Sequence, residues 1–173
     1  MNQPASQQLY WSLLQYDDMD IHLAATSKGL CFVGSPGQSL AELEKAMHKR
    51  FPIGEWVHND DMLEPYKKEL IAYWQGTRIS FTIPLDYAGT AFQLAIWDTL
   101  CHIPYGQTLS YSDIAQAIAR PTASRAVGAA IGANPLLIAI PCHRVIGKRG
   151  ALTGYRGGIP MKMRLLDLEG RAD

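Results

Sequence analysis

The sequence predicts two domains of different class, a small α/β domain over residues 1–88 and a mainly helical domain over residues 89–173 with a helix-turn-helix. Alternation of apolar and polar residues, which is typical of strands, is found in the first half, whereas helical spacing dominates the second. Residues 86–90 between them predict a linker. With 47% hydrophobic residues, the chain of 173 residues can bury a substantial core.

The first half is expected to be a sheet with helices. Two alternating runs within residues 20–34 predict a β-hairpin. Apolar residues at helical spacing predict two helices, and a further alternating run predicts one more strand. These three elements lie at 38–50, 62–74 and 79–83. His22, His48 and His58 have no partners at metal-ligand spacing, so no metal site is expected.

Capping residues delimit the helices of the second half. Thr90 can cap one helix, and Ser110 with Asp113 forms a capping box for the next. Helical spacing resumes over residues 124–133. Two short helices joined by a tight turn predict a helix-turn-helix, whose second helix normally enters a DNA groove. Simple packing of the two helices is the alternative interpretation.

The second of these helices consists almost entirely of small residues, with only Arg125 and Asn134 polar after its first residue. Each interior glycine costs about 1 kcal/mol of helix stability relative to alanine, which suggests that something approaches the backbone closely. A helix-helix contact explains the glycines equally well. A nucleic-acid minor groove, with Arg125 reaching into it, explains the arginine too.

A cysteine stands beside a histidine after an apolar run. Residues 136–140 predict a short buried strand ended by a proline, which would place Cys142 at the end of a rigid element. A thiol attacks only as the thiolate, and His143 and Arg144 offer a neighbourhood that favours this form. Cys142 is therefore a candidate nucleophile, with a buried structural cysteine as the alternative.

The end of the chain predicts a helix from Pro160 to Gly170. Glu169 could orient the histidine that serves the cysteine, although an ordinary surface glutamate gives the same pattern. Residues 1–89 hold 7 Lys+Arg and 11 Asp+Glu, whereas residues 90–173 hold 9 and 5. A basic second half favours a polyanionic partner, although a difference of this size also occurs on ordinary surfaces.

Compartment and redox state follow from the N-terminus and the cysteines. The first six residues carry no basic side chain and lead into no long apolar segment, so we expect neither a signal peptide nor a membrane span, and a cytoplasmic location. Cys31, Cys101 and Cys142 are odd in number and form no C-x-x-C pair. This argues against a disulfide framework or a zinc ribbon and for reduced thiols.

Five segments together resemble the O6-alkylguanine-DNA alkyltransferase family, which the chain matches from about Gly89 to Gly170, with a looser likeness before that. The segments are Tyr111–Ala115, Ser124–Gly128, Asn134-Pro135, Pro141–Gly147 and Gly154–Gly158. The resemblance implies a ribonuclease-H-like sheet with helices in the first domain and a winged-helix-like second domain. It also implies DNA repair by one irreversible transfer of an alkyl group from O6 of guanine, or O4 of thymine, to the protein.

The resemblance assigns the chemistry to five residues. Cys142 would accept the alkyl group, His143 would draw its proton, and Glu169 would orient His143. Tyr111 would donate a hydrogen bond to the leaving base as negative charge builds on it. Asn134 would join the second helix of the helix-turn-helix to the cysteine turn. No cofactor is implied.

The same resemblance implies that double-stranded DNA is bound through its minor groove, with the damaged nucleotide flipped out. The implied DNA contacts are Arg125, which fills the gap left by that nucleotide, Ala126, Gly128, Ala129, Gly132 and Arg144. The implied base pocket comprises Ile131, Val145, Tyr155 and Arg156, the last being a small residue in several relatives. We expect a monomer that binds no membrane. A non-catalytic helix-turn-helix protein with a structural cysteine, and a Cys-His hydrolase, are the alternative hypotheses.

Overall fold

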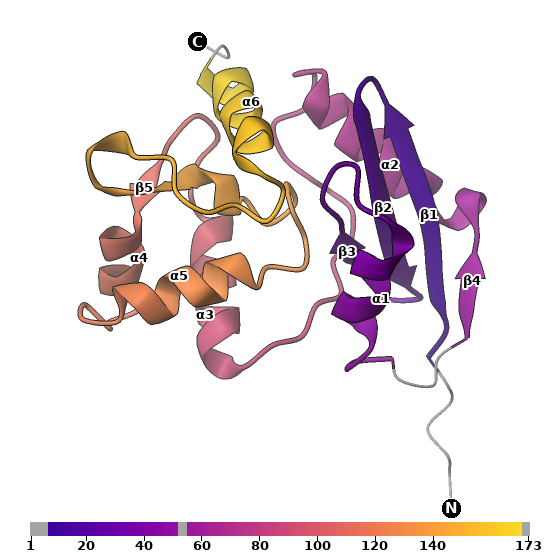
Figure 1. Ribbon diagram of the computed structural model, residues 1–173, viewed down its shortest axis with the longest axis horizontal. Helices are drawn as coiled ribbons and strands as arrows, with labels where there is room; N and C mark the ends of the chain where they lie inside the picture. The colour runs from indigo at the N-terminus through magenta and orange to yellow at the C-terminus, as the bar shows by residue number, and fades with distance from the viewer. Residues whose placement is uncertain (1–6, 52–54, 171–173) are drawn as a thin grey trace, which may run out of the picture.

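The computed structural model describes residues 7–51 and 55–170. A four-stranded sheet with its helices lies beside a helical C-terminal half, as Figure 1 shows. The strands are β1 (Leu9–Tyr16), β2 (Met19–Thr26), β3 (Gly29–Val33) and β4 (Trp56–His58), in the order β3-β2-β1-β4. The first three are antiparallel, and β4 runs parallel to β1. The hairpin expected within residues 20–34 is confirmed by β2 and β3.

Helices pack on both faces of this sheet. They are α1 (Leu40–Met47) and α2 (Asp60–Trp74). Leu43 of α1 shares an apolar cluster with Phe32, whereas Leu63 of α2 shares another with Leu23. A strand that is packed on both faces has a mostly apolar sequence in which apolar and polar residues do not alternate. This explains why β1, with the sequence LYWSLLQY, was not predicted from periodicity.

The C-terminal half contains the expected helices. They are α3 (Ala91–Cys101), α4 (Tyr111–Ala117), α5 (Ser124–Gly132) and α6 (Ile159–Gly170). The capping box predicted at Ser110 forms, and Thr90 caps α3 as expected, in a capping box with Gln93. Helices α4 and α5 make the helix-turn-helix. Two short parallel strands, β5 (Leu109–Ser110) and β6 (Val145–Ile146), and two 3₁₀ turns, η1 (Cys142–Arg144) and η2 (Lys148–Gly150), complete it.

Two expected strands are wrong. In residues 79–83 the backbone N–H of Thr82 donates to the carboxylate of Glu69, at 2.9 Å, rather than to a neighbouring strand. Residues 136–140 form a turn in which the N–H of Ile140 donates to the carbonyl of Leu136 at 3.0 Å and Ile138 has a φ of 70°. Residues 136–140 are buried or half-buried, as their apolar character indicates, whereas Ile79 is exposed. Apolar character does not show where the backbone hydrogen bonds of a segment go.

The turn that precedes Cys142 is attached to the edge of the N-terminal sheet. The N–H of Val33, in the edge strand β3, donates to the carbonyl of Pro135 at 2.9 Å, and Val33 forms an isolated bridge with Leu136. Another part of this edge is covered by Leu85, which forms a bridge with Leu30. The N-terminal sheet therefore supports the segment that carries the candidate nucleophile.

No helix in residues 7–51 and 55–170 is both long and apolar enough to cross a membrane. The expectation that concerned residues 1–6 lies outside the part of the chain that the structure describes.

Candidate active site

Cys142 is the first residue of the 3₁₀ turn η1, and Asn134 holds the preceding turn in place. The side-chain N–H groups of Asn134 donate to the carbonyls of Ile140, at 3.0 Å, and Leu136, at 3.3 Å. Its Oδ1 accepts the N–H of Leu136 at 2.9 Å. Asn134, which is 1% exposed, thus joins the end of α5 to the cysteine turn.

The Cys142 thiol is almost completely buried, at 3% exposure. Burial raises the pKa of Cys142, and a hydrogen bond with Asn134 and the positive charges of Arg156 and Lys162 oppose this only in part. Burial therefore favours the protonated thiol, because desolvation disfavours the charged form. The thiol needs a base to remove its proton.

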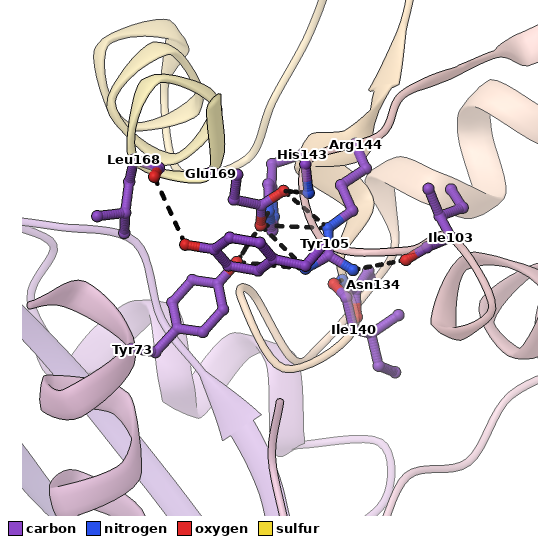
Figure 2. Close-up of polar contacts among 10 residues, drawn as sticks. Tyr73, Ile103, Tyr105, Asn134, Ile140, His143, Arg144, Leu168 and Glu169 are labelled. Atoms are coloured by element: carbon purple, nitrogen blue, oxygen red, sulfur yellow. Dashed lines mark hydrogen bonds and ion pairs between the residues drawn. The ribbon is translucent and has the colours of Figure 1, made fainter. Parts of the chain in front are cut away.

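His143 follows Cys142 in the same 3₁₀ turn. Its Nε2 lies 2.7 Å from Oε1 of Glu169, and both side chains are buried (Figure 2). Burial lowers the pKa of His143 although the Glu169 carboxylate raises it, so the ring is neutral. A neutral ring that donates Nε2–H to a carboxylate has its lone pair on Nδ1. Nδ1 is buried and has no hydrogen-bond partner among the described residues.

Glu169 is ionised deep in the protein. Burial alone would raise the pKa of Glu169, but hydrogen bonds from His143 and Arg144 outweigh it and lower the pKa to about 2. Oε2 accepts Nε–H of Arg144 at 2.9 Å and lies 3.3 Å from the backbone N of Gly106. Glu169 is 3% exposed, so the surface interpretation of this residue does not hold.

Arg144 faces the interior, contrary to the DNA contact that was expected of it. It is 7% exposed, and its Nη1 donates to the carbonyl of Ile103 at 2.6 Å. Its Nε and Nη2 donate to the carboxylate of Glu169. A buried carboxylate needs a partner charge, and the guanidinium supplies it with a fixed fork of donors. Figure 2 shows Arg144 directed at Glu169 and Ile103.

Arg156 also departs from the expected position in the base pocket. Its Nη1 lies 2.8 Å from Oε1 of Glu42 in α1, and its Nη2 donates to the carbonyls of Val33 at 2.8 Å and Asn134 at 3.0 Å. Because the guanidinium N–H groups of Arg156 bind these partners, they are not directed at a base. The side chain links the loop after β6 to the N-terminal half.

The other residues expected at the site, catalytic Tyr111 and the pocket residues Ile131, Val145 and Tyr155, differ in burial. Tyr111, at the start of α4, is half-buried, and its hydroxyl oxygen lies 3.3 Å from Oγ1 of Thr153. Ile131 and Val145 are 6% and 0% exposed. The hydroxyl of Tyr155 is buried without a hydrogen-bond partner in the described part of the chain.

Two residues near the site were not predicted. Lys162 is 1% exposed, and its Nζ donates to the carbonyls of Val145, at 2.6 Å, and Thr153, at 3.2 Å. Its position was detectable, because residues 162, 165 and 169 form one helical stripe. Tyr73 of α2 contacts Glu169 from the N-terminal half, which no local pattern indicates.

One face of α5 is exposed and carries mainly small side chains. Arg125, Ala126, Ala129 and Gly132 are exposed, and Gly128 is half-buried. A Cβ atom built at Gly132 would meet nothing within 4 Å, and one at Gly128 would only touch the ring of Tyr111 at 3.8 Å. Internal helix packing therefore does not require these glycines, which removes one of the two explanations left open by the sequence.

Comparison with known proteins identifies the family. Residues 9–87 match the family model described as 6-O-methylguanine DNA methyltransferase, ribonuclease-like domain, and residues 91–171 match the DNA binding domain of the same protein. A relative from Bacillus subtilis, the inducible methylated-DNA--protein-cysteine methyltransferase, is 61% identical over 95% of this chain and 92% of its own length. The chain belongs to the 6-O-methylguanine DNA methyltransferase family.

Other members of the 6-O-methylguanine DNA methyltransferase family are similar to this chain along most of its length. The Methanosarcina acetivorans methylated-DNA--protein-cysteine methyltransferase is 40% identical over 94% of this chain and 99% of the relative. The crystal structure of Mycobacterium tuberculosis OGT in complex with DNA superposes with a TM-score of 0.81 at 37% identity, covering 94% of this chain and 93% of that one. These matches confirm the family resemblance and the fold class of both halves.

Proposed function

We propose that this protein repairs alkylated double-stranded DNA by direct reversal, moving the alkyl group from O6 of guanine, or O4 of thymine, onto Cys142. The observation that carries the proposal is a buried cysteine followed in the chain by a buried histidine, whose Nε2 lies 2.7 Å from the buried carboxylate of Glu169. The names of the Bacillus subtilis and Methanosarcina acetivorans relatives describe the same reaction, from methylated DNA to a protein cysteine.

The transfer begins with removal of the thiol proton. His143 accepts it through Nδ1, and the imidazolium that forms is stabilised by the Glu169 carboxylate on its other nitrogen. The Cys142 sulfur then attacks the alkyl carbon, so that an S–C bond forms while the C–O bond to the base breaks. The electron pair of that bond passes to the base, where a hydrogen bond from the Tyr111 hydroxyl stabilises the developing charge.

The product explains why each chain acts once. A thioether has no good leaving group, and burial of Cys142 excludes the nucleophiles that would remove the alkyl group. The protein is therefore consumed as a reagent in the reaction that it accelerates.

The exposed face of α5 is the proposed DNA contact. Its small residues allow the backbone to approach the floor of the minor groove, and Arg125 is long enough to occupy the space left by a flipped nucleotide. Flipping is needed because the alkylated atom of a stacked base cannot reach a buried thiol. The small residues that would face the minor groove are Ala126, Gly128, Ala129 and Gly132.

Counting lesions tests this function. With duplex DNA containing O6-methylguanine in fivefold excess over protein, we expect loss of one lesion per chain, after which repair stops. Cys142→Ala should remove none while still binding the duplex. Repair that continues beyond one equivalent would indicate a turnover enzyme, and repair by Cys142→Ala would exclude this acceptor.

The alternatives have less support. A DNA-binding module with a structural cysteine gives no reason for an ionised glutamate and a neutral histidine to be buried beside that cysteine, since burying such groups is costly. A Cys-His hydrolase would need access for water after each cycle, and the 3% exposure of Cys142 does not favour it.

We also propose that the protein works in the cytoplasm as a monomer. A reducing compartment keeps the Cys142 thiol free for reaction. Cell fractionation and size-exclusion chromatography test the two statements, and recovery outside the cytoplasm or elution as a dimer would contradict them.

A further inference from the structure

Tyr73 brings the N-terminal half into the centre of the proposed active site. It lies near the end of α2, and its hydroxyl donates a hydrogen bond to Oε1 of Glu169, the same oxygen that faces Nε2 of His143 (Figure 2). The hydroxyl oxygen is also 3.5 Å from Nε2 of His143 and 3.4 Å from Nη2 of Arg144. Every other side chain in this cluster comes from the C-terminal half.

The Tyr73 ring is held firmly in this position. It is 1% exposed, it stacks on Phe81 with ring centroids 5.2 Å apart, and it meets the edge of Tyr105 at 5.8 Å. Neighbouring residues of α2, Leu70 and Trp74, are buried in the core that the two halves share. The hydroxyl position is thus determined by the packing of one half against the other.

We propose that Tyr73 is a positioning residue for alkyl transfer, whose hydroxyl holds Oε1 of Glu169 in line with His143 and so makes the base depend on the N-terminal half. This inference rests on the function proposed above and deepens it. Tyr73 touches neither the thiol nor the base of the DNA in this scheme. It acts through Glu169.

The hydrogen-bond count of Glu169 gives the physical reason. Oε1 receives donors from Tyr73, His143 and Arg144, and each donor withdraws part of the carboxylate charge. Burial raises the pKa of Tyr73 far above neutrality, so its hydroxyl remains a donor at every pH of interest. Without this hydroxyl, Glu169 would be free to shift, and more of its charge would act on His143.

The Tyr73 hydroxyl also affects the pKa of His143. A carboxylate with fewer donors is a stronger acceptor for Nε2–H, so loss of the Tyr73 hydroxyl raises the pKa of His143. The other ionisable groups around this ring are Arg144 and Lys162, which lower its pKa, and Cys142 next to it in the chain. Removing the Tyr73 hydroxyl leaves these charged groups in place, although it also removes the longer contacts of that hydroxyl with Arg144, at 3.4 Å, and His143, at 3.5 Å. A shift in pH dependence therefore reports on the Tyr73 hydroxyl.

Tyr73→Phe tests the proposal, because it keeps the ring and removes only the hydroxyl. A net hydrogen bond to a charged group is worth about a tenfold factor, so the single-turnover transfer rate at saturating DNA should fall about tenfold. The DNA dissociation constant should be unchanged. The acid limb of the pH-rate profile should move to higher pH, by at most about one unit.

Tyr105→Phe is the matched control. It removes a neighbouring hydroxyl that donates to the carbonyl of Leu168 at 3.5 Å and makes no hydrogen bond to the Glu169 side chain. Rate and pH profile should equal those of the wild-type protein. A Tyr73→Phe protein that also matches the wild type in both measurements overturns the inference, whereas absence of transfer by the wild-type protein would instead refute the proposed function.

A double-mutant cycle separates positioning from a loss of folding. In the Glu169→Gln background, the partner of Tyr73 is already changed, so adding Tyr73→Phe should reduce the rate by less than twofold. A further tenfold loss in that background would show that Tyr73 acts independently of Glu169 and would overturn the inference. Melting temperatures measured for all four proteins identify any variant that fails to fold.

Discussion

Glu169 shows how one residue can serve both stability and chemistry. Its carboxylate compensates the buried charge of Arg144 and at the same time orients His143. An unpaired buried charge costs several kcal/mol, so neither arginine nor glutamate can be lost cheaply. The same ion pair that makes the base effective therefore makes the folded state depend on pH.

The direction of that dependence follows from the pKa of about 2 for Glu169, below its ordinary value of 4.5. A depressed pKa gives stability that is complete above about pH 4.5 and is lost as the pH falls toward 2. We expect the free energy of unfolding of the wild-type protein to fall more steeply over this window than that of Glu169→Gln. Denaturant titrations at a series of pH values measure it, and parallel slopes would contradict the assignment.

The sequence predicted the site residues that are adjacent in the chain or belong to a family motif. It did not predict contacts between distant segments. The Cys142-His143 pair stands out in the sequence, and the family resemblance supplies Glu169. The inward orientation of Arg144 and the contact of Tyr73 depend on how two halves of the chain pack together. Charge alone gives an arginine no direction, so nothing in the sequence indicates that Arg144 faces the interior.

At the scale of elements, helices were easier to predict than strands. Capping boxes at Thr90 and Ser110 are local signals, and both form. β1 was missed because it is packed on both faces, and residues 79–83 were overpredicted because their partner is the Glu69 side chain. Hydrogen bonding between distant segments leaves little trace in periodicity.

The surface of α5 makes a prediction that belongs to the whole element. Gly132→Leu places a side chain in open space, so the fold should be unaffected or slightly stabilised, by up to about 1 kcal/mol. If this face enters a groove, the same change should weaken binding to duplex DNA by about 5- to 150-fold, since overpacking costs about 1–3 kcal/mol. Fluorescence anisotropy and thermal melting measure the two effects.

Ala41→Leu is the control for that variant, because it adds the same side chain at an exposed position of α1. DNA affinity should not change. Equal losses in the two variants, or a large loss of stability in Gly132→Leu, would show that the glycine serves the fold rather than the groove.

At the scale of the whole molecule, the N-terminal half acts as a support for the site. The edge strand β3 holds the turn before Cys142, Arg156 ties the following loop to Glu42, and Tyr73 reaches Glu169. The predicted boundary between residues 88 and 89 stays a prediction, but the contacts across it explain why the two halves function together.

Two arginines that link the halves should differ in their energetic importance. Arg156→Ser leaves the carbonyls of Val33 and Asn134 without their donors, so we expect a loss of about 2 kcal/mol in the free energy of unfolding. Arg164→Gln breaks ion pairs with Asp17 and Asp18 that are largely exposed, and should cost less than about 1 kcal/mol. Urea titrations compare the two, and equal losses would contradict the role of Arg156.

The most direct test of the account is the location of the transferred group. After reaction with duplex DNA that carries O6-methylguanine, the protein is digested and its peptides are analysed by mass spectrometry. We expect one added methyl group, found on the peptide that contains Cys142, while Cys31 and Cys101 remain unmodified. A methyl group on either of those cysteines, or repaired DNA without any modified peptide, would contradict it.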